Sequence, residues 1–215
     1  MKKHIRIILV ALMTLSLIML AGCGGGSSEQ AETPEAPETS QSESVQTADP
    51  VGIHHAEIEI EDYGIVSVEL DGDTAPITVQ NFMDLANEGF YDGLTFHRII
   101  DGFMIQGGDP NGDGTGGSGK NIPGEFEANG YSNNIAHTKG VISMARAQDP
   151  DSASSQFFIM VEDAPHLDGQ YAAFGHVTSG QDVVDRIAAD AKPLDDNGTM
   201  APEDQPVIKS VKIID

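Results

Sequence analysis

Apolar and polar residues alternate along two early segments of this 215-residue chain. AEIEIED (residues 56–62) and IVSVELD (residues 65–71) each place three aliphatic side chains on one face and mainly polar ones on the other. A period of two is typical of a half-buried antiparallel strand, so we predict two strands joined near Tyr63-Gly64. Six further apolar runs predict strands at residues 94–100, 103–106, 140–145, 156–161, 171–177 and 206–215.

Two other segments show a helical period. In residues 78–90 the apolar side chains recur at spacings of three and four, with Thr78 as the predicted N-cap and Gly89 at the predicted end. Residues 180–191 repeat this spacing. Strands at both ends, two helices and no βαβ alternation predict a mainly β fold, an antiparallel β-barrel of about eight strands capped by two α-helices.

The start of the chain is of a different kind. A basic beginning and an apolar run from Ile7 to Leu20 indicate a secretory signal peptide over residues 1–22. The run is short for a bilayer span of about 20 residues, which argues against an uncleaved anchor. LAGC, Leu20 to Cys23, resembles the lipobox of bacterial lipoproteins, in which the cysteine is lipidated. Cys23 is the only cysteine, so no disulfide can form, and we interpret Cys23 as the lipidation site.

Residues 23–52 are rich in Ser, Glu, Thr, Pro and Gly and contain no aromatic residue. Such a segment has too little apolar surface to offset its ordering entropy, which predicts a flexible acidic linker. The globular domain is then expected at residues 53–215. Lipid and linker together predict an extracytoplasmic domain anchored to the cell membrane.

The formal net charge of −23 limits the choice of partner. Loss of Lys2, Lys3 and Arg6 with the signal peptide leaves 11 − 3 = 8 basic against 34 acidic residues, a net charge of −26. Nucleic acid is excluded as a partner because its binding requires a basic surface. The same charge opposes electrostatic docking on anionic lipid and is explained by solubility outside the cell. The sequence leaves the oligomeric state open, with a monomer as the default expectation.

One loop partly matches the sequence pattern of a calcium-binding site. DPNGDG, residues 109–114, fits the first half of a calcium loop, but Lys120 occupies the position that requires a bidentate glutamate. The histidines have no metal-ligand spacing, and no G-x-S-x-G elbow is present. We expect no metal and no cofactor. A metal-dependent envelope hydrolase remains a further alternative, which predicts loss of activity with a chelator.

The stretch FHRIIDGFMIQGGD, residues 96–109, predicts a hairpin around Asp101-Gly102. Arg98 lies inside its first apolar run and Gln106 closes the second. A lone arginine in a strand more often forms an ion pair than acts in catalysis. Here, however, FHRIIDGFMIQGGD, GTGG, GVISMAR, SSQFFIMV and HLDGQYAAFGHV follow in order within residues 96–177. In these motifs, and from about Ile58 to Ile213, the chain resembles the cyclophilins, which are peptidyl-prolyl cis-trans isomerases. The resemblance implies that the fold is a closed eight-stranded antiparallel β-barrel capped by two α-helices.

The resemblance implies catalytic roles for Arg98, Gln106 and Phe103 and a substrate that contains proline. The residues that it implies for substrate binding are Met104, Ala145, Arg146, Gln156, Phe158, His166, Leu167 and Tyr171. Three of these depart from the family's common pattern. His166 stands where the best-known eukaryotic members have tryptophan, Tyr171 where many have histidine, and Arg146 where asparagine is common.

We therefore expect an isomerase that acts on X-Pro bonds of unfolded or partly folded secreted or envelope proteins, since proline isomerisation can limit folding. Arg98 is expected to donate a hydrogen bond to the proline nitrogen when the bond is twisted. The alternative from another class is a chaperone or scaffold module that binds Pro-containing segments without turnover.

Overall fold

The computed structural model describes residues 51–215, so the predicted signal peptide, Cys23 and nearly all of the predicted linker lie outside the described residues. The helices are α1 (Pro76–Asn87) and α2 (Gln181–Asp190), and three short 3-10 helices are η1 (Glu127–Asn129), η2 (Pro165–Leu167) and η3 (Pro202–Asp204). The strands are β1 (Ile53–Ile60), β2 (Gly64–Asp71), β3 (Thr95–Ile100), β4 (Met104–Asp109), β5 (Val141–Met144), β6 (Phe157–Met160), β7 (Ala173–Ser179) and β8 (Ile208–Ile213).

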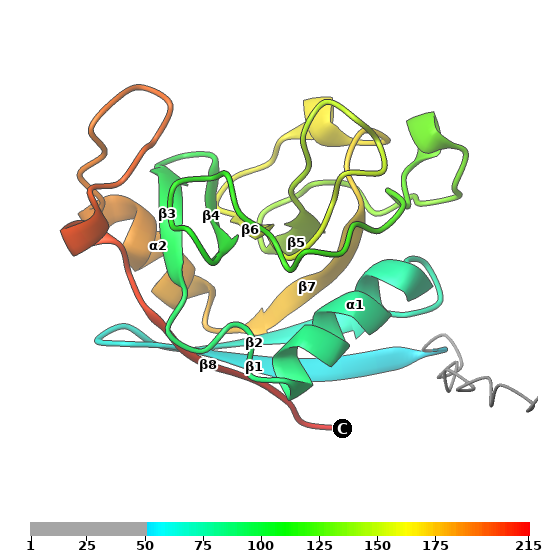
Figure 1. The fold of residues 1–215 in the computed structure, drawn as a ribbon, viewed down its shortest axis with the longest axis horizontal. Coiled ribbons are helices and arrows are strands. Elements are labelled where there is room, and N and C mark those ends of the chain that lie inside the picture. The colour runs from blue at the N-terminus through cyan, green and yellow to red at the C-terminus, as the bar shows by residue number, and fades with distance from the viewer. Residues whose placement is uncertain (1–50) are drawn as a thin grey trace, which may run out of the picture. The chain divides into compact units, whose positions relative to one another are not determined.

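All eight strands belong to one curled antiparallel sheet (Figure 1). Their order is β3-β4-β6-β5-β7-β2-β1-β8. Helix α1 contacts β8 and β2, whereas α2 contacts β2 and β4, and the two helices lie toward opposite ends of the sheet in Figure 1. The predicted number of strands and helices and the mainly β class are confirmed.

The prediction of a closed barrel is wrong, because the sheet is open between β3 and β8. The two edges approach each other at a single bridge between Thr95 and Val207 and at a neighbouring hydrogen bond from the N–H of Gly93 to the carbonyl of Ile208 (2.8 Å). Pro206, which precedes this bridge, has no N–H to donate to a longer ladder. Further along β3, the N–H of Ile99 donates to the carbonyl of Gly198 at 2.8 Å. A loop therefore covers the part of the β3 edge that β8 would occupy in a closed barrel.

The alternation predicted for the first hairpin is confirmed. Ile58 on β1 lies directly opposite Val66 on β2, and both side chains are fully buried. The strands are joined through residues 61–63, where Asp62 has a positive φ of 64°. The other members of the buried stripe are Ala56, Ile60, Val68 and Leu70.

Helix α1 begins differently from the prediction. Its N-cap is Ala75, which has no side chain able to cap, and Thr78 lies inside the first turn with its hydroxyl buried. The Glu125 carboxylate instead accepts hydrogen bonds from the N–H groups of Ile77 (3.1 Å) and Thr78 (2.7 Å). The predicted end is confirmed, since Gly89 follows the helix with φ of 70°. Neither helix within residues 51–215 is long and apolar enough to cross a membrane.

The main core is built around Phe82, which α1 inserts against the inner face of the sheet. Its ring centroid lies 5.2 Å from that of Tyr91, 5.5 Å from Phe157 and 5.4 Å from Phe174. Tilted and edge-on contacts of this kind are the favoured geometries for aromatic pairs. A second, smaller apolar cluster includes Met104, Phe158 and Leu167 and forms the support of the candidate site.

Candidate active site

The candidate site is built on a row of residues across neighbouring strands. Arg98 on β3 is the register partner of Gln106 on β4, and Gln106 is in turn the partner of Phe158 on β6. Side chains directly opposite each other in an antiparallel pair share one face of the sheet. The row therefore places a guanidinium, an amide and an aromatic ring side by side on rigid strands.

Arg98 is held by contacts on both sides. Its Nε donates to the backbone oxygen of Asn197 (2.8 Å), and Nη2 lies 3.4 Å from the Oδ1 of that residue. Nη1 donates to the Oε1 of Gln106 (3.3 Å) and lies 3.9 Å from the sulfur of Met104. A guanidinium has five N–H donors, so these four contacts within residues 51–215 leave one donor for a substrate. Partial burial lowers the pKa of Arg98 below its usual value, and the group stays charged at neutral pH.

The amide of Gln106 is oriented by a second amide behind it. Its Nε2 donates to the Oε1 of Gln156 (2.9 Å), and the Nε2 of Gln156 donates to the carbonyls of Gly114 (3.1 Å) and Gly116 (2.8 Å). This chain leaves the Oε1 of Gln106 facing Arg98. The glycine-rich loop thus fixes, through two glutamines, the acceptor that orients the guanidinium.

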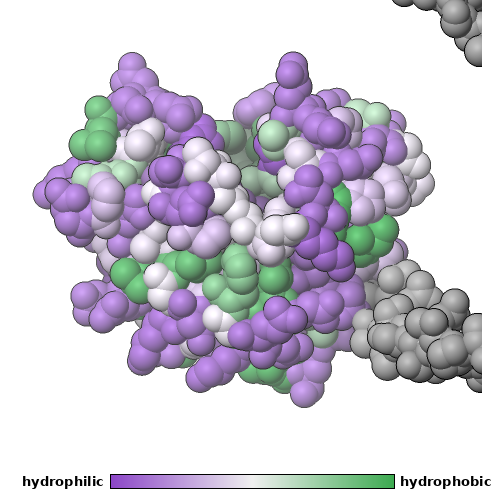
Figure 2. All heavy atoms as spheres, in the orientation of Figure 1, coloured by the Kyte–Doolittle hydropathy of each residue, from purple (hydrophilic) through white to green (hydrophobic). Residues whose placement is uncertain are grey.

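Beside the row lies a cavity of about 410 Å³. The side chains of Phe103, Met104, Phe158 and Leu167 give it an apolar wall, and Phe103 stacks on His166 with ring centroids 5.8 Å apart. The space-filling view shows the molecule notched between the loop that follows α2 and the projection that carries η2 (Figure 2, in the orientation of Figure 1). Apolar walls with a few fixed polar groups are the usual form of a ligand site.

The cavity brings together ten of the eleven residues that the sequence indicated for the site within this domain. They are Arg98, Phe103, Met104, Gln106, Ala145, Arg146, Phe158, His166, Leu167 and Tyr171. The eleventh, Gln156, lines an adjoining cavity of about 420 Å³, to which Gln106, Ala145 and Arg146 also contribute. The two hollows therefore form one continuous groove.

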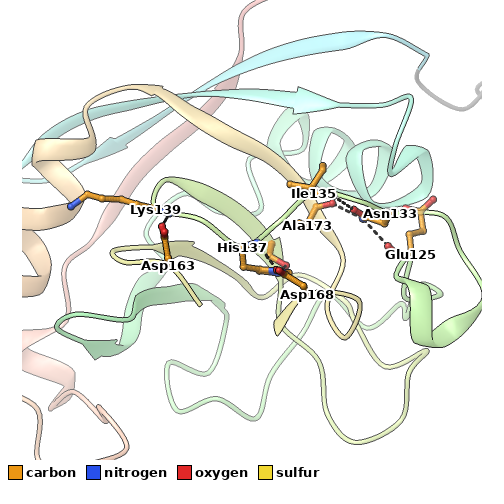
Figure 3. A network of polar contacts seen from close by, with 9 residues as sticks. Glu125, Asn133, Ile135, His137, Lys139, Asp163, Asp168 and Ala173 are labelled. Atoms are coloured by element: carbon orange, nitrogen blue, oxygen red, sulfur yellow. Dashed lines mark hydrogen bonds and ion pairs between the residues drawn. The ribbon is translucent and has the colours of Figure 1, made fainter. Parts of the chain in front are cut away.

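A polar network that the sequence did not indicate lies beneath Phe158. The ring of His137 stacks on that of Phe158 with centroids 6.1 Å apart and an interplanar angle of 20°. Its Nδ1 lies 3.0 Å from the Oδ1 of Asp168 (Figure 3), and its Nε2 lies 3.0 Å from the Oγ of Ser143. The N–H of His137 also donates to Asp168 and lowers the pKa of that carboxyl, while burial lowers the pKa of His137 below 6.5.

Ser143, His137 and Asp168 are the residue types of a hydrolase triad, but the serine is not accessible to a substrate. Ser143 is fully buried, at 0% exposure, and does not line either cavity, although it is the register partner of Phe158. A nucleophile must reach the carbonyl that it attacks. The network therefore supports Phe158 from behind and gives no basis for a hydrolase.

The calcium-like loop has a local explanation. The buried carboxylate of Asp109 accepts hydrogen bonds from the N–H groups of Asn111 (2.8 Å), Asp113 (3.1 Å) and Gly114 (2.6 Å). Within residues 51–215 no cluster of three or more His, Cys, Asp or Glu side chains is arranged to hold a metal ion. The acidic residue thus closes the loop that carries Gly114 and Gly116 to Gln156.

Asn197 is the contact residue that sequence reasoning missed. Its NGT motif has the form of a glycosylation acceptor, and nothing local connects a loop 99 residues away with Arg98. Gly198 allows the approach, because it has φ of 86° and a Cβ there would lie 2.6 Å from the carbonyl oxygen of Ile99. Only the tertiary structure brings this loop to β3.

Asn197 contacts Arg98 through its backbone oxygen and through its side chain, and we expect different effects when each contact is lost. Asn197→Ala removes the long 3.4 Å contact and keeps the backbone acceptor at 2.8 Å, so we expect kcat/KM to fall by only about two- to threefold. Gly198→Ala pushes the loop off β3 and displaces that acceptor, which should lower kcat/KM by about ten- to a hundredfold, since a hydrogen bond to a charged group contributes roughly 1.5–3 kcal/mol. Steady-state kinetics on one proline peptide would check both; equal effects would show that the backbone acceptor does not orient Arg98.

Comparison with known proteins agrees with this geometry. Residues 55–213 match the family described as "Cyclophilin type peptidyl-prolyl cis-trans isomerase/CLD". Peptidyl-prolyl cis-trans isomerase B of Bacillus subtilis is 53% identical over 121 residues, which cover 56% of this chain and 81% of the relative. A peptidyl-prolyl cis-trans isomerase of Helicobacter pylori is 48% identical over 126 residues, 58% of this chain and 74% of the relative.

Solved structures give the same result. The crystal structure of a cyclophilin-type isomerase from Cryptosporidium parvum aligns with a TM-score of 0.67 at 30% identity, covering 76% of this chain and 99% of that one. The fold and the matched family define a prolyl isomerase. This chain belongs to the family of cyclophilin-type peptidyl-prolyl cis-trans isomerases.

Proposed function

We propose that Arg98 is the catalytic group of this isomerase and that the cavity beside it holds the proline ring. The observation that carries the proposal is the fixed guanidinium with one unused donor at the edge of an apolar cavity. Rotation about a peptide bond costs about 18–20 kcal/mol because resonance holds the bond planar. For X-Pro the two isomers differ by only about 0.5–1 kcal/mol, so the obstacle is the barrier.

The proposed mechanism is selective binding of the twisted bond. When the bond twists, conjugation is lost, and the proline nitrogen gains a lone pair that accepts a hydrogen bond from Arg98. The planar ground state offers no such acceptor, so this contact lowers the barrier without tightening substrate binding. Phe103, Met104, Phe158 and Leu167 grip the ring while Gln106 and the backbone near Arg146 hold the flanking chain. No covalent intermediate and no cofactor is required.

The related Cryptosporidium protein was also solved in the presence of the dipeptide Ala-Pro, at a TM-score of 0.66. This supports proline-containing polypeptides as the substrate class of the present chain. Exchange spectroscopy by NMR on an Ala-Pro peptide with the purified protein tests the proposal, and we expect accelerated cis-trans exchange. Shifted peptide signals without faster exchange would instead support a chaperone or scaffold that only binds.

We further propose that the enzyme acts outside the cytoplasm as a lipid-anchored monomer on secreted or envelope proteins. The basic and apolar start, the LAGC motif ending at Cys23 and the acidic linker support this placement. Metabolic labelling with radioactive palmitate in a bacterial host tests it. Label on the full chain that is absent from Cys23→Ala is the expected result; equal label on both would rule out Cys23 as the anchor.

A further inference from the structure

We propose that Arg146 gives the groove a subsite for an acidic side chain, so that this isomerase prefers proline segments carrying a nearby Asp or Glu. The inference rests on the proposed peptide site. Arg146 follows β5 and lines both hollows of the groove. Its position is thus between the proposed proline cavity and the region that would receive residues flanking the proline.

The guanidinium of Arg146 is held rigidly. Its central carbon lies 4.8 Å from the ring centroid of Tyr171 and 5.0 Å from that of Phe126. Nε donates to the carbonyl of Gln170 (3.0 Å), and Nη1 donates to that of Ala147 (2.9 Å). Nη1 also lies 3.4 Å from the carbonyl oxygen of Gln148, so two aromatic rings and three carbonyls fix the plane of the group. A fixed fork loses less entropy on binding a carboxylate than a mobile one.

The positive charge of Arg146 remains unneutralised. Within residues 51–215 its Nη2 donates to no protein acceptor, and no ion pair includes this residue. Of the eight lysines and arginines within residues 51–215, only Lys139 and Lys209 form ion pairs, with Asp185 at 2.9 Å and Glu59 at 2.6 Å. Of the other six, only Arg98 and Arg146 line the groove. In a chain of net charge −23, an arginine without a carboxylate at the edge of a groove is a feature that a ligand would explain.

The carboxylates nearest in sequence are engaged elsewhere. Asp151 accepts from the side chain of Asn129 (2.9 Å) and from the N–H of Gly124 (3.3 Å). Asp149 accepts from the N–H of Asp151 (3.0 Å) within its own turn. Neither is drawn to the guanidinium. A carboxylate is a suitable partner for the free Nη2, because a hydrogen bond between two charged groups is stronger than one between neutral groups.

A position scan tests the subsite. In an alanine-rich peptide with one proline, a single glutamate is moved from three residues before the proline to three residues after it, and each peptide is paired with its glutamine counterpart. All glutamate peptides meet the same overall repulsion from the acidic protein, which is screened beyond about 8 Å at 0.15 M salt. A preference for glutamate at one position therefore reports a local contact.

We expect the protein to bind glutamate over glutamine by about three- to tenfold at one position, the range for an ion pair between a partly buried arginine and a carboxylate. Arg146→Gln should remove this preference. Arg186→Gln should retain it, because Arg186 packs on Tyr63 away from the groove. Equal binding of all glutamate and glutamine pairs, or a preference that survives in Arg146→Gln, would overturn the inference.

The proposed peptide site is tested separately in the same series. Accelerated exchange of the all-alanine proline peptide with no glutamate preference leaves the peptide site standing and removes only the acidic subsite. Failure to bind or accelerate any peptide contradicts the proposed function itself.

Discussion

Replacing Arg98 by alanine is expected to lower kcat and kcat/KM for an Ala-Pro peptide by about 10²–10³-fold, the usual effect of removing one preorganised donor from a transition state. Peptide affinity should change little, because the apolar wall of the cavity remains in place. A loss shared equally by kcat and kcat/KM is the sign of an interaction made only in the transition state. Exchange spectroscopy gives the turnover, and peptide titration gives the affinity.

Two variants make this experiment decisive. Arg98→Lys keeps the charge but cannot contact Asn197 and Gln106 at the same time, so we expect it to resemble alanine more than arginine. Arg186→Ala removes an arginine outside the groove and should leave turnover unchanged. Parallel losses of affinity and turnover in Arg98→Ala would mean that Arg98 binds the ground state as well, which would favour a binding module.

Local sequence pattern was sufficient for the elements of the fold. A period of two identified the strands of the first hairpin, because one face of each is buried against the core. The helical period identified α1 and α2 for the same reason. Closure of the barrel was not predictable in this way, since it depends on whether distant edges meet. Pro206 and the loop around Gly198 decide that question. A proline in a strand run does indicate an edge, but the sequence does not show which edge it would face.

Some residues of the candidate site could likewise be identified from the local sequence, whereas others could not. Arg98 and Gln106 stood out because polar groups in an otherwise apolar hairpin demand an explanation, and the register places them opposite each other. Asn197 and His137 could not be found from the sequence, because each acts through a contact made only in the folded chain. Arg146 was visible as a departure from the family pattern, but its unpaired charge appears only in the structure.

Two loops and the neighbouring strand β4 support Arg98. Asn197 approaches from the loop before β8, while Gln106 is oriented through Gln156 by the loop that Asp109 closes. Phe158 is backed by His137. Residues held on rigid strands and locked by a second layer of hydrogen bonds keep the geometry that catalysis requires. The open edge of the sheet contributes to this arrangement. The loop around Asn197 and Gly198 lies along β3 in place of β8, and the same loop contacts Arg98.

The second large effect that we expect is on the free energy of unfolding, and it concerns the N-terminus of α1. The helix has Pro76 in its first turn, which has no N–H, and the next two N–H groups donate to the carboxylate of Glu125. Glu125 is only 2% exposed. An anionic side chain at a helix N-terminus is stabilised by the free N–H groups and by the helix dipole. Glu125 therefore caps the N-terminus of α1, the role that we predicted for Thr78.

Glu125→Gln is expected to lower the free energy of unfolding by about 2–3 kcal/mol, because it removes the charge and turns an amide donor toward N–H groups. Thr78→Val should leave stability unchanged or raise it by up to roughly 1 kcal/mol, since the buried Thr78 hydroxyl makes no hydrogen bond within residues 51–215. Urea unfolding followed by circular dichroism measures both. If Thr78→Val instead cost as much as Glu125→Gln, the threonine would be the cap after all, and the long-range carboxylate would be incidental to the helix.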